Sequence, residues 1–321
     1  MQVSDEEFDR QRELARTCWY LTGATASGKS AIAMLIAEAL DAEIISLDSM
    51  AIYQDMDIGT AKPNLENRKR CPHHLIDIVE PPKEFSVNEY CDAAFSKIRE
   101  IQNRGKKVLF VGGTALYLKT ILRGAFQGPP ADWDFRNAIL KEIKDIGSEH
   151  LIQRLQQVDP LSAHKLHPND TRRIIRALEV YKTTGVPISH MQTQFDESTN
   201  ANENRAFALR WPREHLHERI DRRVEQMFAR GFIDEVKGLR EKYGQLGRTA
   251  SQAVGYREVC ELLDEKVATD EVIQLVKNRT HQFARHQETW FRGLSEVRWI
   301  ERSHSQSNEQ VAEEIVTATS G

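Results

Sequence analysis

The sequence is poor in cysteine, and its four cysteines are spread far apart. Cys18, Cys71, Cys91 and Cys260 form no C-x-x-C pair, so they fit neither a disulfide framework nor a zinc site, and they favour a reducing compartment. The chain also lacks the continuous apolar run of about 18 residues that a membrane-spanning helix needs. Its first ten residues are acidic and hold no apolar core, so we expect no signal peptide. We therefore predict a cytoplasmic protein that does not enter a membrane.

A strong excess of one charge is absent as well. The 321 residues carry 44 lysines and arginines against 48 aspartates and glutamates, a formal net charge of −4. This balance gives no global sign of nucleic-acid binding, so any such binding must come from local basic patches. The chain is long enough for one large domain or two ordinary ones, and it shows no internal repeat.

A phosphate-binding loop lies near the start of the chain, Gly23-Ala24-Thr25-Ala26-Ser27-Gly28-Lys29-Ser30. It matches G-x-x-x-x-G-K-[ST] at every fixed position, between an apolar run at 18–21 and a predicted helix at 31–40. Glycines let backbone N–H groups face an anion, and the helix N-terminus adds positive potential. Lys29 brings a charge to the phosphates, and Ser30 offers a hydroxyl to a magnesium ion. The loop predicts binding of a di- or triphosphate.

Strand and helix patterns alternate after this loop. Apolar runs predict strands at 43–47, 74–79 and 107–111, with helices at 88–103 and 115–122. Strands that are apolar throughout indicate a parallel sheet with both faces covered by helices. We therefore predict an α/β fold, a P-loop NTPase-like parallel sheet flanked by helices.

The middle of the chain departs from this alternation. Between Asp132, an N-cap, and Gly185, a stop signal, only helical periodicity is present. Strand character returns at 205–211, and a short strand at 297–300 and a closing helix at 308–318 end a mostly helical stretch. We predict a catalytic core in two parts, 1–128 and 201–321, with an all-α insertion domain at 129–200.

Three polar groups follow predicted strands: the phosphate loop, Asp48-Ser49, and Gly112-Gly113-Thr114. In an open parallel sheet, ligands bind outside the carboxyl ends of the strands, so we expect these groups to converge on one crevice. Asp48 is then the leading carboxylate for metal or general-base chemistry, although a helix cap or a solvated loop acid is its alternative role. Asp77 is expected inside its strand and receives less weight.

Basic residues gather in the second half of the chain. Seven arginines lie within 205–230, and a second basic stretch within 277–299 is interleaved with Phe283, Trp290, Phe291 and Trp299. Arginine among aromatics suits phosphate contact and base stacking. Solvated helix faces paired with neighbouring acids would show the same composition, so both interpretations stay open.

Several stretches within residues 18–295 carry a more specific pattern. After the phosphate loop they are Asp48-Ser49-Met50-Ala51-Ile52-Tyr53, Met56-Asp57-Ile58-Gly59-Thr60-Ala61-Lys62-Pro63, His73-His74-Leu75-Ile76-Asp77, Val111-Gly112-Gly113-Thr114-Ala115-Leu116-Tyr117, His167-Pro168-Asn169-Asp170, Gln252-Ala253-Val254-Gly255-Tyr256-Arg257 and Thr289-Trp290-Phe291-Arg292. In this order they resemble the tRNA dimethylallyltransferases, the IPP transferase family. Members of that family prenylate the adenine next to the anticodon.

The resemblance implies a transferase reaction. A dimethylallyl group would move from dimethylallyl diphosphate to N6 of the adenine 3′ to the anticodon, position 37, and diphosphate would leave. The phosphate loop, magnesium and Lys29 would stabilise that leaving group, and Asp48 would act as the base for the weakly nucleophilic amine. The implied catalytic residues are Asp48, Lys29 and Thr25. Ser30, with Asp48, is the implied Mg²⁺ ligand, and Arg223 or its helical neighbour Arg219 is a further implied diphosphate contact.

The resemblance also implies a grip on tRNA. The target adenine must be flipped out of its stack, which costs a few kcal/mol. The helical insertion would hold the anticodon stem, and the implied tRNA contacts are Asp48, Ser49, Met50, Ala51, Thr114, Thr171, Arg172, Arg173, Gln252, Ala253, Val254, Gly255, Tyr256 and Arg257. One departure from the family pattern is His286, where a second basic residue is expected. We expect neither a membrane nor an obligate protein partner.

Three other functions share parts of this pattern. An ATP-dependent small-molecule or nucleotide kinase would share the loop and the sheet, but the apolar strand 108–111 ends in Gly-Gly-Thr where a magnesium-binding acid is usual. An adenylate isopentenyltransferase acting on free AMP or ATP would share Asp48 but has little use for an arginine-bearing insertion. Intact Lys29 and Ser30 argue against a non-catalytic RNA-binding protein.

Overall fold

The computed structural model describes residues 5–124, 126, 128–192, 205–265 and 268–318. They form two compact units, one within Arg123–Glu197 and the other from Ser4–Leu122 together with Ser198–Gly321. Each unit is described by itself below. Among the described helices, none combines the length and the apolar character that crossing a membrane requires.

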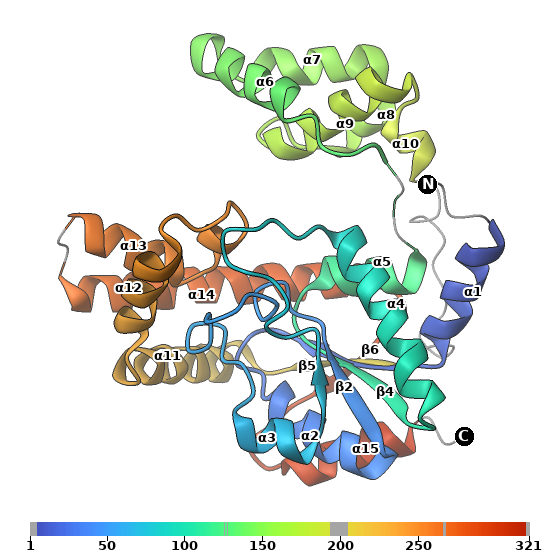
Figure 1. The fold of residues 1–321 in the computed structure, drawn as a ribbon, viewed down its shortest axis with the longest axis vertical. Coiled ribbons are helices and arrows are strands. Elements are labelled where there is room, and N and C mark those ends of the chain that lie inside the picture. The colour runs from blue at the N-terminus through green and yellow to red at the C-terminus, as the bar shows by residue number, and fades with distance from the viewer. Residues whose placement is uncertain (1–4, 125, 127, 193–204, 266–267, 319–321) are drawn as a thin grey trace. The chain divides into compact units, whose positions relative to one another are not determined.

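A six-stranded sheet, parallel at every pairing, organises the larger unit (Figure 1). Its order is β3-β2-β4-β1-β5-β6, so the strand that leads into the phosphate loop lies in the middle. The strands are β1 (Trp19–Gly23), β2 (Ala42–Ser46), β3 (His73–His74), β4 (Lys107–Val111), β5 (Arg205–Arg210) and β6 (Val297–Glu301). The predicted α/β class is confirmed, and β5 pairs with β1 although 181 residues separate Gly23 from Arg205 in the sequence, a stretch that includes the whole smaller unit.

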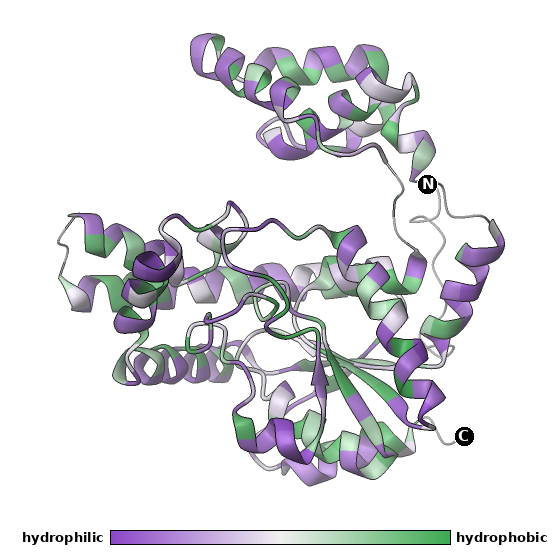
Figure 2. Ribbon diagram, viewed as in Figure 1, coloured by the Kyte–Doolittle hydropathy of each residue, from purple (hydrophilic) through white to green (hydrophobic). Residues whose placement is uncertain are grey.

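Helices cover both faces of the sheet, because alternate strand residues point to opposite sides. On one face, α2 (Lys29–Leu40) packs against α15 (Asn308–Thr317), and a core that includes Ile36, Leu109 and Ile315 lies between them and the strands. On the other face lie α1 (Asp5–Arg16), α4 (Val87–Asn103) and α5 (Ala115–Arg123). There the Tyr90 hydroxyl donates to the Ser46 carbonyl. Figure 2 shows the hydrophobic colour concentrated along the strands.

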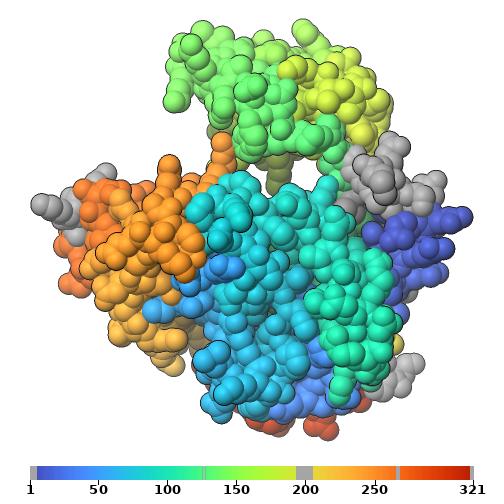
Figure 3. Space-filling view, in the orientation of Figure 1, coloured from blue at the N-terminus to red at the C-terminus, as the bar shows by residue number. Residues whose placement is uncertain are grey.

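A second core lies beside the sheet. It packs the buried segment around Ile52 and Met56 against four helices of the last third of the chain. These are α11 (Arg213–Ala229), α12 (Phe232–Tyr243), α13 (Tyr256–Glu265) and α14 (Thr269–Arg292), with α3 (Leu65–Arg70) and the 3₁₀ turn Ala250–Gln252 completing the elements of this unit. Figure 3 shows the segment around residues 50–80 directly beside the orange surface of α12 and α13.

The predicted third strand is wrong beyond its first residue. β3 holds only His73 and His74, whereas the prediction covered 74–79. Leu75 and Asp77 have φ of +57° and +59°, a left-handed conformation that a strand excludes. Asp77 therefore lies in a turn outside the strand, where it is paired with Lys62 and Arg68.

The smaller unit contains helices only, within the residues that the structure describes. They are α6 (Trp133–Ile146), α7 (Glu149–Val158), α8 (Pro160–Lys165), α9 (Thr171–Thr184) and α10 (Ile188–Met191). Asp132 caps α6 by accepting from the backbone N–H of Phe135, and Gly185 ends α9 with φ of +71°. These two signals lie where the sequence predicts them. A core of Ile139, Leu151, Ile174 and other apolar residues holds the helices together.

A buried ion pair supports the same unit. The Glu179 carboxylate is fully buried and accepts hydrogen bonds from Arg136, from Arg176 and from the backbone N–H of Asp132. Burial alone would raise the pKa of Glu179, but the two guanidinium groups outweigh it and the pKa is lowered. Arg176 also donates to the Pro129 carbonyl, so its charge is used within the unit.

Candidate active site

The phosphate loop runs from the end of β1 into α2 and is held from outside by side chains distant in sequence. Gly23 has φ of +136°, and a Cβ there would lie 2.6 Å from the Leu209 carbonyl oxygen, so the position requires glycine. Trp211 donates its indole N–H to the Ser27 carbonyl at 2.9 Å. Arg219 Nε donates to the Ala26 carbonyl at 2.8 Å.

A glutamine of α14 ties this loop to the turn after β4. The backbone N–H of Thr25 donates to Gln287 Oε1, and Gln287 Nε2 donates to the Gly113 carbonyl, both at 2.8 Å. A Cβ on Gly113 would lie 2.3 Å from Gln287 Nε2, which explains glycine at this position. This buried glutamine was not predicted from the sequence. The adjacent Thr289-Trp290-Phe291-Arg292 motif was the signal that could have found it.

The ends of the central strands meet as the topology requires. A Cβ on Gly112 would lie 2.1 Å from the Leu47 carbonyl oxygen, so the β4 turn approaches the end of β2 at backbone distance. Thr114 donates its N–H to the Leu47 carbonyl and accepts from the Ser49 N–H at 3.0 Å. The structure thus brings together the phosphate loop, Asp48-Ser49 and Gly112-Gly113-Thr114.

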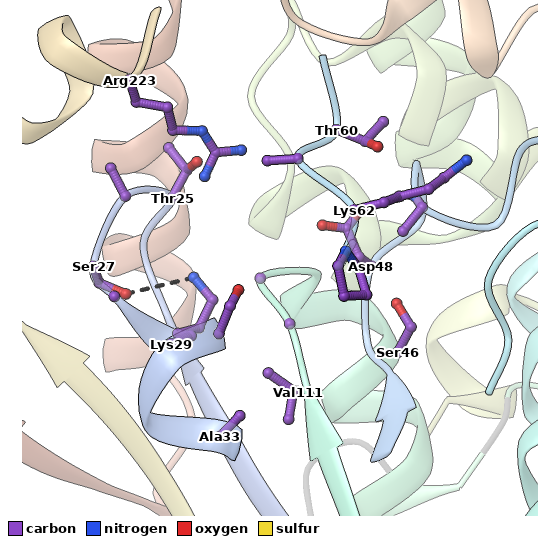
Figure 4. A pocket seen from close by; sticks show the side chains of 18 of the residues that line it. Thr25, Ser27, Lys29, Ala33, Ser46, Asp48, Thr60, Lys62, Val111 and Arg223 are labelled. Atoms are coloured by element: carbon purple, nitrogen blue, oxygen red, sulfur yellow. Dashed lines mark hydrogen bonds between the residues drawn. The ribbon is translucent and has the colours of Figure 1, made fainter. Parts of the chain in front are cut away.

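These groups surround a cavity of about 480 Å³ within the larger unit (Figure 4). Asp48 is its one acidic residue among those the structure describes, whereas five cations line it: Lys29, Lys62, Arg219, Arg222 and Arg223. Figure 4 shows Lys29 and Arg223 on one side and Asp48 on the facing side. A cavity with this excess of positive charge suits a multiply charged anion such as a di- or triphosphate.

Asp48 uses its two carboxylate oxygens differently. Oδ1 accepts from the N–H groups of Met50 at 2.8 Å and Ala51 at 3.3 Å, so the carboxylate caps the turn that follows β2. Within the described residues, Oδ2 makes no hydrogen bond or ion pair, and the side chain lies in the cavity wall. The cap fixes the carboxylate while leaving one oxygen for a ligand, so both roles that the sequence left open for Asp48 are compatible.

Lys29 and Arg223 are largely shielded from solvent, and this changes their pKa values. Burial of the ammonium group and the nearby Arg223 lower the pKa of Lys29 to about 7, and Asp48 opposes that shift. Burial also lowers the pKa of Arg223, again opposed by Asp48. Lys29 Nζ donates to the carbonyls of Gly23 at 2.9 Å and Ala24 at 2.7 Å.

The segment Met56–Pro63 is held beside the cavity by hydrogen bonds to a side chain of α12, which the sequence did not predict. Glu235 of α12 accepts from the backbone N–H groups of Asp57, Ile58 and Gly59, and from the Tyr256 hydroxyl. A Cβ on Gly59 would lie 2.4 Å from the Tyr256 ring, so only glycine allows this packing. Thr60 and Lys62 line the cavity as a result.

The charge of Lys62 is paired with carboxylates next to it. Its buried ammonium group donates to the Tyr53 carbonyl and to the carboxylates of Asp57 and Asp77. This charge is compensated, unlike that of Arg223, which forms no ion pair with any residue that the structure describes. Of the five cavity cations, Lys62 is therefore the one that forms an ion pair within the described residues.

The remaining residues expected to contact tRNA fall into three groups. Ser49, Met50 and Thr114 are partly exposed near the cavity, and Ala51 is buried in its wall. Gln252 is exposed, Val254 and Arg257 are half-buried, and Ala253, Gly255 and Tyr256 are buried. Thr171, Arg172 and Arg173 begin α9 in the smaller unit, where both arginines are exposed.

Magnesium ligands are available at the cavity. The Ser30 hydroxyl and the Asp48 carboxylate are hard oxygen donors, and both residues line it. Magnesium is usually held by one or two such protein oxygens together with water and phosphate oxygens, and this donor set fits that pattern.

Comparison with known proteins identifies relatives along most of the chain. The family model described as IPP transferase matches residues 51–294. A tRNA dimethylallyltransferase of Rhodopirellula baltica is 48% identical over 295 residues, which cover 89% of this chain and 88% of that protein. One from Pelotomaculum thermopropionicum is 41% identical over 303 residues, covering 94% and 96%.

Solved structures similar to this chain carry names of the same kind as the relatives in sequence. The full-length tRNA isopentenylpyrophosphate transferase of Bacillus halodurans has a TM-score of 0.66 at 34% identity, covering 95% of this chain and 97% of that one. A eukaryotic dimethylallyltransferase, described as acting on tRNA, has a TM-score of 0.75 at 27% identity, covering 93% and 77%.

Proposed function

The chain belongs to the IPP transferase family, and from that premise we propose that it is a tRNA dimethylallyltransferase. It transfers a dimethylallyl group from dimethylallyl diphosphate to N6 of adenine 37, next to the anticodon, and releases diphosphate. The observation that carries this assignment is the cavity in which one carboxylate, Asp48, faces Lys29 and Arg223. A base opposite an anion site is what alkylation of an amine by an allylic diphosphate needs.

The leaving group is held at the phosphate loop. As the bond between the allylic carbon and the diphosphate oxygen breaks, its electron pair leaves with the diphosphate. The Lys29 charge and the N–H groups at the start of α2 would stabilise that developing charge, in a site where the low dielectric strengthens their effect. Thr25 is placed by Gln287 to complete the loop. Magnesium, when bound, would be held by the Ser30 hydroxyl and would further neutralise the diphosphate, so that the free oxygen of Asp48 stays available for the proton.

The choice between Arg219 and Arg223 follows from their neighbours. Arg219 Nε already donates to the Ala26 carbonyl, and its guanidinium lies 4.8 Å from the centre of the Trp211 ring. Arg223 lines the cavity across from Asp48 and forms no ion pair with a described residue. We therefore assign Arg223 as the diphosphate contact and Arg219 as a support of the loop.

The attacking amine is prepared on the facing side. N6 of the flipped adenine forms a bond to the allylic carbon, and its proton passes to the free oxygen of Asp48. Hydrogen bonds from Met50 and Ala51 keep the other oxygen in place during this transfer. Holding amine and allylic carbon together in one cavity removes the entropy cost of a bimolecular encounter.

We propose that the tRNA is held by both units of the chain. The exposed Arg172 and Arg173 on α9 suit backbone phosphates of the anticodon stem, and Gln252 suits the loop next to the flipped base, whereas Arg257 is paired with Glu258 and Glu261. The Arg176 charge is committed to Glu179, so we leave it out of this interface. Four cysteines without disulfides suit a reducing compartment, and we place the reaction in the cytoplasm.

One experiment tests the assignment against its rivals. The protein is incubated with labelled dimethylallyl diphosphate and unmodified tRNA, with AMP, or with labelled ATP and candidate acceptors, and the products are separated as nucleosides. Label on N6 of adenine 37 supports the proposal. Label on free AMP favours an adenylate isopentenyltransferase, and phosphate transfer from ATP favours a kinase; either result without tRNA labelling overturns it.

A further inference from the structure

Three side chains that commonly bind metals meet beside Trp211, outside the residues that line the cavity. His215 and Glu218 lie one turn apart on α11, and His304 lies in the turn after β6. His215 Nδ1 is 2.9 Å from His304 Nε2 and 3.9 Å from a Glu218 carboxylate oxygen. The ligand atoms of all three lie within 4.8 Å of one another, and no other trio of His, Cys, Asp or Glu in the described part of the chain does so.

These separations match a transition-metal site. Ligands about 2.05 Å from a tetrahedral zinc ion lie about 3.3 Å from one another. The His215–His304 and His215–Glu218 separations fall on either side of that value, and all three atoms lie within 4.8 Å of one another, so shifts of the side chains would place a cation among them. Two imidazoles and one carboxylate form a frequent zinc ligand set, with water in the fourth position.

The two rings are hydrogen-bonded to each other, and His304 is exposed whereas His215 is partly buried. The His304 ring lies 5.4 Å from the buried Trp211 ring and 4.2 Å from the His215 ring, which it meets edge-on. The two imidazoles therefore lie close together before any ion arrives, and an ion binds there by displacing the proton that their facing nitrogens share. The Glu218 side chain is 67% exposed, so an ion has direct access from solvent.

Two arginines near Trp211 oppose a cation, and because their hydrogen bonds go to neutral acceptors both keep their positive charge. Arg219 bonds to the phosphate loop at Ala26. Arg302 donates to the Ser307 carbonyl and to Asn308 Oδ1. Glu218 adds a negative charge to the trio, which lowers the cost of placing a divalent cation there.

We propose that His215, Glu218 and His304 form a binding site for a divalent cation of the zinc class. Imidazole nitrogen selects Zn²⁺, Ni²⁺ or Cu²⁺ over Mg²⁺, so this site is chemically distinct from the one at Ser30 and Asp48. The ion links the first turns of α11 to the segment between β6 and α15. Because Trp211 and Arg219 bond to the phosphate loop, the ion stiffens the wall that supports this loop.

The test measures binding to the full chain, stripped of metal, by calorimetry with Zn²⁺. We expect one equivalent per chain, and we expect His304→Ala to weaken binding about tenfold or more, because even the loss of an outer-shell partner commonly costs 10- to 100-fold. Glu218→Gln should weaken it less. His217→Ala is the matched control: this histidine lies on the same helix and stacks on His281, outside the trio.

A second readout locates the ion. Bound Ni²⁺ should quench the fluorescence of Trp211, so the quenching seen in the wild type should be lost in Trp211→Phe. It should also be lost in His304→Ala, which lacks a ligand of the ion. Zn²⁺ should raise the thermal midpoint of the wild type and of His217→Ala, but not of His304→Ala, because a ligand of the folded state stabilises it. If a folded His304→Ala protein binds Zn²⁺ as the wild type does, the ion is bound elsewhere, for example at Cys260, and the proposal is overturned. The absence of stoichiometric Zn²⁺ binding to the wild type also overturns it.

Discussion

Arg223 in the cavity and Arg176 on α9 use the same side chain in opposite ways. Arg223 faces the cavity with a pKa that burial lowers, and among the described residues no carboxylate forms an ion pair with it. Arg176 places its guanidinium against a carboxylate that is fully buried. An uncompensated cation in a low-dielectric site is available to an anionic ligand, whereas a compensated one stabilises the fold. The difference lies in the partner, which composition does not show.

Replacing Asp48, the one acidic residue that lines the cavity, tests whether the cavity is the catalytic site, and we expect it to have the largest effect of the substitutions below. Asp48→Asn should lower kcat for prenyl transfer by about 10²- to 10⁴-fold, the usual contribution of a general base. The amide keeps an oxygen for the Met50 and Ala51 N–H groups, so the turn should persist. Single-turnover assays measure the rate, and tRNA binding measured alongside should stay unchanged. Near-normal turnover would remove Asp48 from the role of base.

Loss of the buried carboxylate tests the structural side. Glu179→Ala leaves Arg136 and Arg176 without their partner and should destabilise the smaller unit by about 3–5 kcal/mol. Glu142→Ala is the control, since Glu142 pairs with Arg154 in a partly exposed position and should cost less than about 1 kcal/mol. Urea unfolding followed by circular dichroism measures both. Equal effects of the two substitutions would contradict the structural assignment of Arg176.

The pKa of Lys29 should make the affinity of the cavity for an anion depend on pH. With a pKa of about 7 in the free protein, Lys29 loses its charge as the pH rises above 7. Pyrophosphate binds the charged form, so its affinity should be greatest below pH 7 and fall up to tenfold per pH unit above it. Calorimetry from pH 6 to pH 9 measures the slope. In Lys29→Met, the remaining pH dependence of the affinity comes from the titration of pyrophosphate itself. If the wild type and Lys29→Met show the same slope of affinity against pH, Lys29 stays charged over this range.

The exposed arginines should give the smallest effect. Arg172→Ala with Arg173→Ala should weaken tRNA binding severalfold and reduce the slope of log affinity against log salt by about one for each phosphate interaction that the substitutions remove. Pyrophosphate binding should not change. Filter binding between 50 and 200 mM salt measures the slope, and an unaltered slope would exclude these arginines from the interface.

The sequence predicted most of the framework because its signals are local. The phosphate loop, the alternation of apolar strands and helices, Asp132 as a cap and Gly185 as a stop each depend on residues within a few positions of one another. The parallel pairing then follows from strands that are apolar throughout. The same local logic failed at 75–79, where the apolar pattern was right but Leu75 and Asp77 adopt a left-handed backbone.

The contacts that complete the cavity were not predictable in this way. Gln287 reaches a loop 262 residues earlier in the chain, and Glu235 binds a segment 176 to 178 residues earlier. His304 meets His215 across 89 residues. No periodicity or spacing connects such positions, since each pairing depends on which helix the folded core places beside which strand end.

By itself, the sequence determined that this chain builds a parallel sheet around a phosphate loop, because glycines, caps and apolar periods act over single turns of backbone. Only the tertiary structure decided which charges are left without a partner. Whether an arginine binds a ligand or supports a helix depends on the carboxylate that packing places against it, and that carboxylate often comes from elsewhere in the chain.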